Sequence, residues 1–125
     1  MLTERSLKAL QGVHGDLVRV VHRADELTDL EFVVTEGLRT MKRQRELVAA
    51  GASSTLRSRH LTGHAIDFAP LLPDGTITWK WPAFWPIVEA FEKASKELNI
   101  PIECGARWKK FPDGPHVQLP WKGYE

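Results

Sequence analysis

Apolar residues recur at helical spacing in the N-terminal part of the chain. Within residues 16–27 they lie three or four positions apart, which predicts an amphipathic helix with one face in the core. Its apolar positions are Leu17, Val20, Val21, Ala24 and Leu27. A shorter helix is predicted around residues 4–10. Residues typical of helix N-termini predict two further helices, one beginning after Thr40 and the other at Pro82.

Short stretches rich in β-branched and aromatic residues predict strands between and after these helices. They are residues 31–34, 65–69, 76–79, 102–104 and 116–119. Because the helices come first and no βαβ alternation follows, the predicted fold class is α+β, a small antiparallel sheet with helices packed on it. All of residues 1–125 are expected to form a single domain, since this length can bury one core but not two.

Cysteine content and hydropathy exclude several classes of protein. Cys104 is the only cysteine, so an internal disulfide and a thiolate zinc cluster are excluded, and this residue is expected to fill space in the core. The sequence has neither the apolar segment of a signal peptide nor a run of about 18 apolar residues. The sequence therefore predicts a protein that is made in the cytoplasm without stable membrane association. If this protein acts beyond the membrane, another protein must release it.

Charge gives a local signal rather than a general one. The net charge of +1 does not predict a nucleic acid partner, but basic residues are in excess between Arg39 and Arg59. The charged residues between these two are Lys42, Arg43, Arg45 and Arg57, with Glu46 as the acid. We favour a solvated helix face here over a surface attracted to an anionic polymer.

The stretch SRHLTGHAIDFAP, residues 58–70, gathers two histidines and an aspartate. His60 and His64 have the spacing at which a helix presents two imidazoles to one metal. However, Thr62 and Gly63 between them are weak helix formers, and no glutamate follows His60. The helical metal site is therefore rejected.

A strand through residues 65–69 gives a better arrangement. Alternation places Asp67 on the face opposite to Ile66 and Phe68. A carboxylate on a half-buried strand is costly unless it is paired or coordinates a cation. Because Gly63 allows a sharp turn, His60 can reach the same point and supply a nitrogen ligand beside the carboxylate oxygen.

A catalytic zinc generally has three protein ligands and an open position for water. His14 and His22 lie in the helical N-terminal region, where an exposed or hydrogen-bonded histidine is the plainer interpretation, so His116 is the best third ligand. Asp113, three residues earlier in the turn PDGP, can lie beside the metal as the base for a water. The alternative for Asp113 is a simple turn residue.

Three motifs resemble those of the zinc peptidase superfamily of D-alanyl-D-alanine carboxypeptidases and L-alanyl-D-glutamate peptidases. They are EGLRTMKRQ, with an arginine after a glycine; SRHLTGHAIDFAP, which fits Ser-x-His-x-x-Gly-x-Ala-x-Asp; and FPDGPHVQLP, with an acid three residues before a histidine. They occur in family order and the resemblance spans residues 13–119. The chain looks most like small single-domain phage endolysins, which implies a Hedgehog/D,D-peptidase-like fold.

The resemblance implies a role for each matching residue of the metal site. His60, Asp67 and His116 would bind one Zn²⁺ per chain. Asp113 occupies the general-base position, where carboxypeptidase members usually have glutamate.

Four further residues match the substrate-side positions of these motifs. Arg39 matches the arginine that binds substrate or stabilises the oxyanion, and its alternative is a surface ion pair with Glu36. Ser58 matches the motif serine, which would form a hydrogen bond either to a residue that supports the metal ligands or to the substrate. Gln44 and Trp108 match more loosely and would equally suit packing.

The function that the resemblance implies is a zinc endopeptidase that hydrolyses the L-alanyl-D-glutamate bond of peptidoglycan stem peptides during phage lysis. Such a protein would be a monomer, made in the host cytoplasm, released through a pore formed by a separate phage protein, and active on the wall in the periplasm. One alternative is a D,D- or L,D-carboxypeptidase, in which Arg39 or Arg107 would receive the substrate carboxylate. Another is a non-catalytic, wall-binding virion component.

Overall fold

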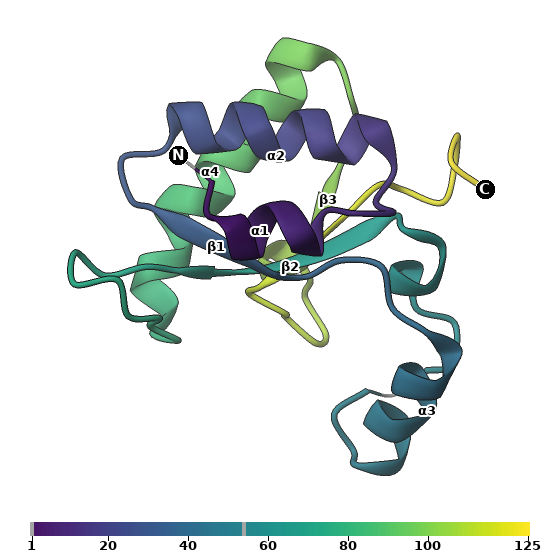
Figure 1. The fold of residues 1–125 in the computed structure, drawn as a ribbon. Coiled ribbons are helices and arrows are strands. Elements are labelled where there is room, and N and C mark those ends of the chain that lie inside the picture. Colours follow the sequence, from purple (N-terminus) through teal and green to yellow (C-terminus); the bar gives the residue numbers. More distant parts are fainter. Residues whose placement is uncertain (1, 54) are drawn as a thin grey trace.

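The computed structural model describes residues 2–53 and 55–125, which form a four-stranded antiparallel sheet with helices packed on it (Figure 1). The strand order is β1-β2-β4-β3. The strands are β1 Phe32–Glu36, β2 Ala65–Pro70, β3 Glu103–Cys104 and β4 His116–Gln118. The helices are α1 Glu4–Ala9, α2 Gly15–Leu27, α3 Met41–Ala49 and α4 Trp81–Leu98, with short 3-10 turns η1 Arg59–Thr62 and η2 Gly105–Arg107. The predicted α+β class is confirmed.

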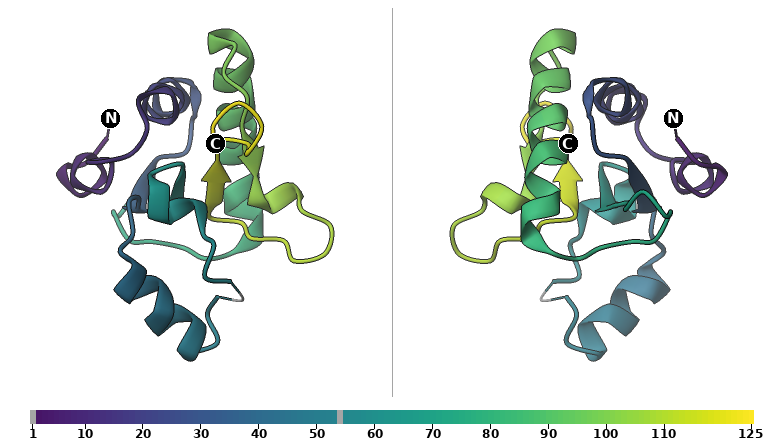
Figure 2. Two further views of the ribbon diagram at one scale, coloured as in Figure 1. Left: turned by 90° about the vertical axis from the view of Figure 1, so that its right-hand side faces the viewer. Right: turned by 90° about the vertical axis from the view of Figure 1, so that its left-hand side faces the viewer.

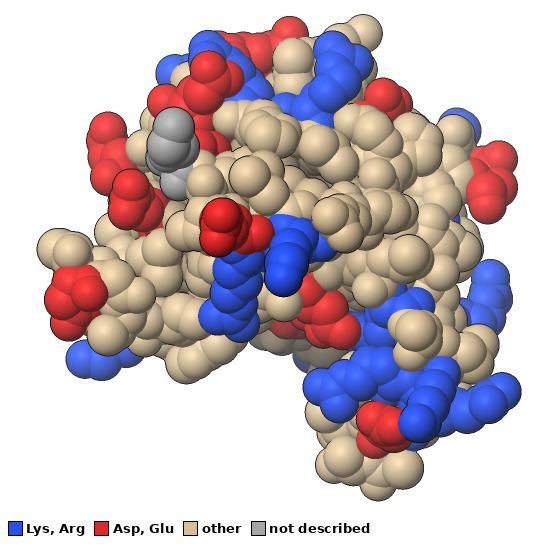
Figure 3. All heavy atoms as spheres, viewed as in Figure 1, with Lys and Arg blue, Asp and Glu red and all other residues tan. Residues whose placement is uncertain are grey.

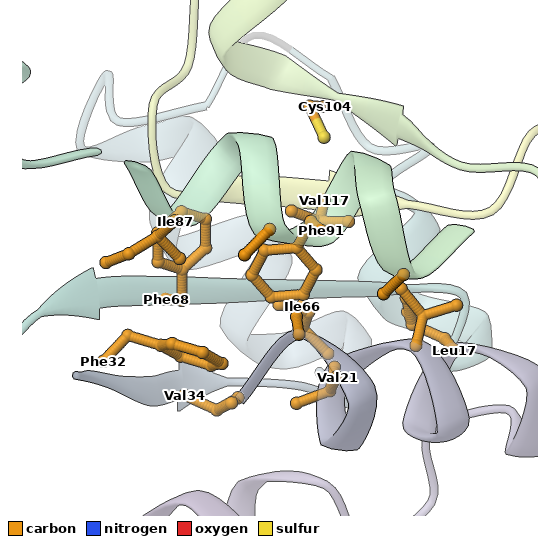
Figure 4. Close-up of a cluster of buried hydrophobic side chains, with 14 of the residues drawn as sticks. Leu17, Val21, Phe32, Val34, Ile66, Phe68, Ile87, Phe91, Cys104 and Val117 are labelled. Atoms are coloured by element: carbon orange, nitrogen blue, oxygen red, sulfur yellow. The ribbon is translucent and has the colours of Figure 1, made fainter. Parts of the chain in front are cut away.

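The hydrophobic core lies between the sheet and helices α2 and α4 (Figure 4). Ile66 and Phe68 point into it from β2, and both are fully buried, as strand alternation predicts. From the helices it receives Leu17, Val20, Val21, Ala24, Ile87, Val88 and Phe91. Burial of each large apolar side chain contributes about 1.5–3 kcal/mol, so this face of β2 is strongly fixed. Asp67 is thereby directed to the opposite face.

All four predicted helices are present. Thr40 caps α3 as expected, because its hydroxyl accepts a hydrogen bond from the Arg43 amide. Pro82 lies in the first turn of α4, where its missing N–H costs nothing. Helix α3 projects away from the sheet (Figures 1 and 2), and Gln44 is its only buried residue. A helix that buries a single polar side chain is held by that side chain's hydrogen bonds rather than by a core.

The strand expected over residues 76–79 is wrong. Only an isolated bridge between Leu71 and Ile77 forms there. The chain reverses at a turn in which the Asp74 carboxylate accepts hydrogen bonds from both the amide and the hydroxyl of Thr76. The Leu72 amide donates to the Thr76 carbonyl and the Thr78 amide to the Pro70 carbonyl, so the returning segment lies against the end of β2. The pairing stops after the single bridge, and Trp79 beyond it is 61% exposed, so no strand forms.

Candidate metal site and catalytic cleft

Strand register places three polar side chains in one row across the sheet. Asp67 on β2 pairs directly with His116 on β4, so their side chains share a face. A β-bulge between Val34 and Glu36 then brings Glu36 opposite Asp67 from the other side. Two acids and a histidine therefore meet on the face of the sheet that the core does not cover.

His60 reaches this row from the 3-10 turn before β2. The Ser58 hydroxyl caps the turn by accepting a hydrogen bond from the His60 amide. Gly63 ends it with a φ of +75°, and a Cβ there would overlap the carbonyl oxygen of Gly12. The turn that the sequence predicts at Gly63 is confirmed, and it directs the His60 ring at Asp67.

His60, Asp67 and His116 bring their ligand atoms together. His60 Nε2 lies 3.3 Å and His116 Nδ1 3.4 Å from Asp67 Oδ1. One ligand atom from each residue lies within 4.8 Å of the other two, so the group could hold a metal ion. His60 Nε2 and Asp67 Oδ1 are buried without a hydrogen-bond partner. Such atoms are costly in an empty site, and a cation between them would satisfy both.

The remaining ring nitrogens are held by neighbouring groups. His60 Nδ1 lies 2.8 Å from the carbonyl oxygen of Gly37, which can only accept, so this nitrogen carries the proton. His116 Nε2 lies 2.8 Å from Gln118 Oε1, and the Gln118 amide donates to Glu103 at 3.1 Å. These contacts leave the lone pairs of His60 Nε2 and His116 Nδ1 facing Asp67, the tautomers that a metal requires.

The electrostatics of the group favour a charged carboxylate. Burial would raise the pKa of Asp67, but the close approach of the His116 and His60 rings holds it well below the usual range. Burial would lower the pKa of His116, but the adjacent Asp67 carboxylate outweighs it and raises the pKa above 6.5. In the metal-free protein the Asp67 carboxylate therefore favours the protonated form of His116.

Arg39 adds a fixed positive charge to the row. Its guanidinium pairs with Glu36 through two contacts of 2.7 Å, and its Nη2 lies 3.8 Å from Asp67 Oδ2. The ion pair with Glu36 expected as an alternative does form, but it is not a surface pair, since the Arg39 side chain is only 8% exposed. Gln44 Oε1 accepts from Arg39 at 2.8 Å, so the buried residue of α3 positions this guanidinium.

Asp113 lies at the rim of the same site in the loop between η2 and β4. Its amide donates to the Gly105 carbonyl and its own carbonyl accepts from the His116 amide, which fixes it beside the histidine. Partial burial and the negative charge of Asp67 raise the pKa of Asp113, although His116, His60 and Arg39 oppose this. A carboxylate with a raised pKa is a stronger proton acceptor than an ordinary aspartate.

These groups line an open cleft of about 840 Å³. Ser58 and Asp113 both line it, as do Arg39 and the three residues of the metal-binding group. Trp108 forms part of the wall, 37% exposed, with its ring centroid 5.2 Å from that of His116. Gln44 lies behind the wall, fully buried. The structure thus brings all the predicted site residues to one cleft or directly behind it.

Gly105 allows the Asp113 loop to close on β4. A Cβ at this position would overlap the Asp113 carbonyl oxygen and lie 3.0 Å from the His116 Cβ. Gly105→Ala is therefore expected to destabilise the protein by about 1–3 kcal/mol, as overpacking does, and to displace Asp113. Urea denaturation measures this, with Gly15→Ala as the control because a Cβ there meets nothing within 4 Å. Equal stability of the two variants would show that the loop does not depend on the contact.

Two contributors to the site were missed at the level of sequence. Gln118 stands two residues after His116 on a strand, so it shares the same face, and that spacing was an available signal. The Gly37 carbonyl carries no such signal, because a backbone contact across 23 residues depends on the tertiary fold.

Other candidate residues lie elsewhere. His14 caps α2 by accepting from the Asp16 amide, and His22 is exposed on the same helix. His64 contacts the Thr62 hydroxyl, outside the metal-binding group. Cys104 fills core space, and burial raises the pKa of its thiol to about 12.

The basic segment is not one surface. Arg39 is buried in the cleft wall and Arg59 is 3% exposed, so neither belongs to an exposed patch. Lysine and arginine side chains do gather over α3 (Figure 3), where Arg43 pairs with Glu46 at 3.9 Å.

The fold and site together define an α+β protein whose cleft carries a His-Asp-His group able to hold a metal. The sequence model of the family described as phage L-alanyl-D-glutamate peptidase matches residues 1–119. The chain belongs to this family.

Individual relatives agree with the match. The L-alanyl-D-glutamate peptidase of Escherichia phage T5 is 40% identical, over 93% of this chain and 95% of that protein. The peptidoglycan L-alanyl-D-glutamate endopeptidase CwlK of Bacillus subtilis is 32% identical over 72% of this chain and 61% of its own length. The crystal structure of the Serratia marcescens L-Ala D-Glu endopeptidase ChiX superposes with a TM-score of 0.93 at 47% identity, over 99% of this chain and 93% of that one.

Proposed function

We propose that the chain is a zinc endopeptidase that hydrolyses the L-alanyl-D-glutamate bond of peptidoglycan stem peptides. The observation that carries the metal in this proposal is the pair of buried, unpartnered ligand atoms, His60 Nε2 and Asp67 Oδ1, with His116 Nδ1 beside them. The activity named for the relatives supports the choice of bond. Two imidazoles and one carboxylate are a donor set that zinc favours, and they leave the ion with a net positive charge. When bound, zinc supplies Lewis acidity, which lowers the pKa of water and polarises a carbonyl.

Asp113 acts as the general base in this proposal. Its place at the rim of the cleft, outside the metal-binding group, lets it take a proton from the attacking water. The same carboxyl group then donates that proton to the amine of the departing D-glutamyl fragment. One residue thereby serves both halves of the hydrolysis.

Arg39 stabilises the negative charge that develops on the substrate carbonyl oxygen. Glu36 and Gln44 hold its guanidinium before substrate arrives, so little reorganisation is needed at the moment of reaction. Ser58 supports His60 through the turn, and Trp108 packs against His116 while it lines the cleft. We assign these two residues positioning roles rather than chemical ones.

The biological setting follows from the same proposal. The chain would work as a single-domain, monomeric phage endolysin that meets the wall in the periplasm after a separate phage protein opens the membrane. Among residues 2–53 and 55–125, no helix has the length and apolar character needed to cross a bilayer.

Digestion of purified sacculi tests the proposed reaction. Zinc-loaded protein is expected to release fragments with new D-glutamate amino termini, and removal of zinc with a chelator should stop their release. Mass spectrometry after amino-terminal labelling identifies the bond. Release of terminal D-alanine with intact L-alanyl-D-glutamate bonds would instead indicate a carboxypeptidase.

Zinc binding is expected to weaken at acidic pH because of His116. In the metal-free protein its pKa is raised above 6.5 by Asp67, so it keeps its proton to a higher pH than a free histidine. Zinc must displace that proton, and its affinity should therefore begin to fall as the pH drops through this raised value, above 6.5. Competition with a zinc chelator between pH 5 and about 8.5 measures the profile. An affinity that stays constant down to pH 6 would contradict the assignment.

Gln118→Leu should weaken zinc binding without removing a ligand. The variant deletes the acceptor at His116 Nε2 and frees the ring to rotate or change tautomer. Loss of such a supporting contact typically costs about 10–100-fold in metal affinity. Zinc titration of this variant, with the thermal midpoint of the metal-free protein as a fold control, gives the comparison. Wild-type affinity in a folded variant would show that Gln118 does not position His116.

A further inference from the structure

The cleft continues beyond the metal site into a second hollow. Thr55, Arg57 and Trp121 line this hollow, and all three also line the main cleft, so the two spaces adjoin. No part of the proposed hydrolysis uses these residues. They line space that adjoins the metal-binding group within the same cleft.

Trp121 is fixed in place by a buried arginine. The Arg59 guanidinium lies 4.2 Å from the centroid of the Trp121 ring. Its Nη2 donates to the backbone carbonyls of Pro120 at 3.0 Å and Tyr124 at 2.9 Å, on either side of that tryptophan. Cation–π contact and these hydrogen bonds hold the indole as a rigid wall of the hollow.

Arg57 lies over the same indole ring, with its guanidinium carbon 5.3 Å from the centroid. Its amide donates to the Thr55 hydroxyl at 2.9 Å, which restrains the backbone. Its side chain is exposed, and within residues 2–53 and 55–125 no carboxylate forms an ion pair with it or with Arg59. The stacked arginine therefore keeps its donors available toward the hollow.

Positive charge at this end of the cleft is incompletely neutralised. Arg59 Nη1 is buried and has no hydrogen-bond partner. Glu103 and Glu125 act on Arg59 only through longer-range attraction. Two guanidiniums on one indole, without a paired acid, create a local field that attracts an anion.

We propose that Arg57, supported by Trp121 and Arg59, forms a subsite that binds a free carboxylate of the stem peptide on the D-glutamate side of the scissile bond. This inference rests on the proposed function. Glutamate has two carboxyl groups, so a stem peptide that continues through one of them still carries the other, and further free carboxylates occur toward its end. A guanidinium held flat on an aromatic ring presents paired N–H groups that match a carboxylate.

The test combines enzyme variants with modified substrates. Synthetic L-alanyl-D-glutamyl stem peptides are prepared with all carboxylates free and with each one converted in turn to a carboxamide. Kinetics are measured for wild type, Arg57→Gln, Arg57→Lys and the control Arg45→Gln, which removes an equal charge from the exposed surface of α3. Amidating one particular carboxylate is expected to raise the wild-type KM about tenfold, the loss typical of a charged hydrogen bond, with kcat nearly unchanged.

With the free peptide, Arg57→Gln should show the same raised KM, and amidation should raise it no further. The KM of Arg57→Lys should lie between those of wild type and Arg57→Gln. Arg45→Gln should behave as wild type. An Arg57→Gln effect that is equal for free and amidated peptides, or that Arg45→Gln reproduces, would overturn the subsite.

A binding experiment separates this inference from the proposed reaction. If wild type leaves the L-alanyl-D-glutamate bond intact, the proposed function is wrong, but that result does not decide whether the subsite exists. The NMR signal of the Arg57 Nε–H in zinc-loaded Asp113→Ala protein still reports on the subsite. It should shift with the free peptide and not with the peptide amidated at the recognised carboxylate, and equal shifts with both would reject the subsite.

Discussion

Replacing His116 by alanine is expected to abolish zinc binding and hydrolysis together. The variant leaves a histidine and an aspartate, too few protein ligands for a catalytic zinc site. Loss of the several kcal/mol that a metal contributes to charge stabilisation corresponds to a rate reduction of about 10³-fold or more. Metal analysis of the purified protein, beside peptide release from sacculi, measures both effects.

The control for this variant is His22→Ala, which removes an exposed histidine from α2. It should retain one zinc per chain and wild-type activity. The metal-free His116→Ala protein should also fold, because the core face of β4 is formed by Val117 rather than by the histidine. Unchanged zinc stoichiometry in a folded His116→Ala protein would place the site elsewhere.

Asp113→Asn is expected to keep zinc and lose activity. The amide is nearly isosteric with the carboxylate but cannot accept the proton of the attacking water. General-base catalysis contributes typically about 10²–10⁴-fold, and kcat should fall by that factor. Because the pKa of Asp113 is raised, wild-type activity should fall at acidic pH as this group gains a proton, and with zinc kept saturating at every pH the variant should lose this dependence.

Asp74→Asn serves as the matched control, since Asp74 lies in an exposed turn and outside the cleft. It changes one carboxylate to an amide and should leave kcat and zinc content unaltered. A folded, zinc-containing Asp113→Asn protein that still hydrolyses at the wild-type rate would show that another group accepts the proton.

Much of the site was predictable because its geometry follows from local rules. Alternation along β2 separates Ile66 and Phe68 from Asp67, and burial of the two apolar residues enforces the separation. Gly63 marks the turn that returns His60 to the same place, since only a residue that tolerates positive φ fits there. These signals lie within ten residues of one another, so no knowledge of the tertiary fold was needed.

Other features depend on the tertiary fold and were beyond sequence reasoning. The β-bulge that brings Glu36 opposite Asp67 arises from the pairing of β1 with β2. The expected strand over residues 76–79 failed because its pairing with the end of β2 stops after one bridge, and a local pattern does not show where a pairing ends. The charge pattern alone likewise could not show that Arg39 is turned into the cleft, a role that only the family resemblance implied, because its burial follows from contacts with Glu36 and Gln44.

The central claim is that two imidazoles and one carboxylate hold a zinc ion over this face of the sheet. Anomalous diffraction at the zinc absorption edge, from crystals of the zinc-loaded protein, tests it most directly. The account predicts one peak per chain, about 2.0–2.2 Å from His60 Nε2, His116 Nδ1 and a carboxylate oxygen of Asp67. A peak on the other ring nitrogens, or on His14 and His64, would contradict it.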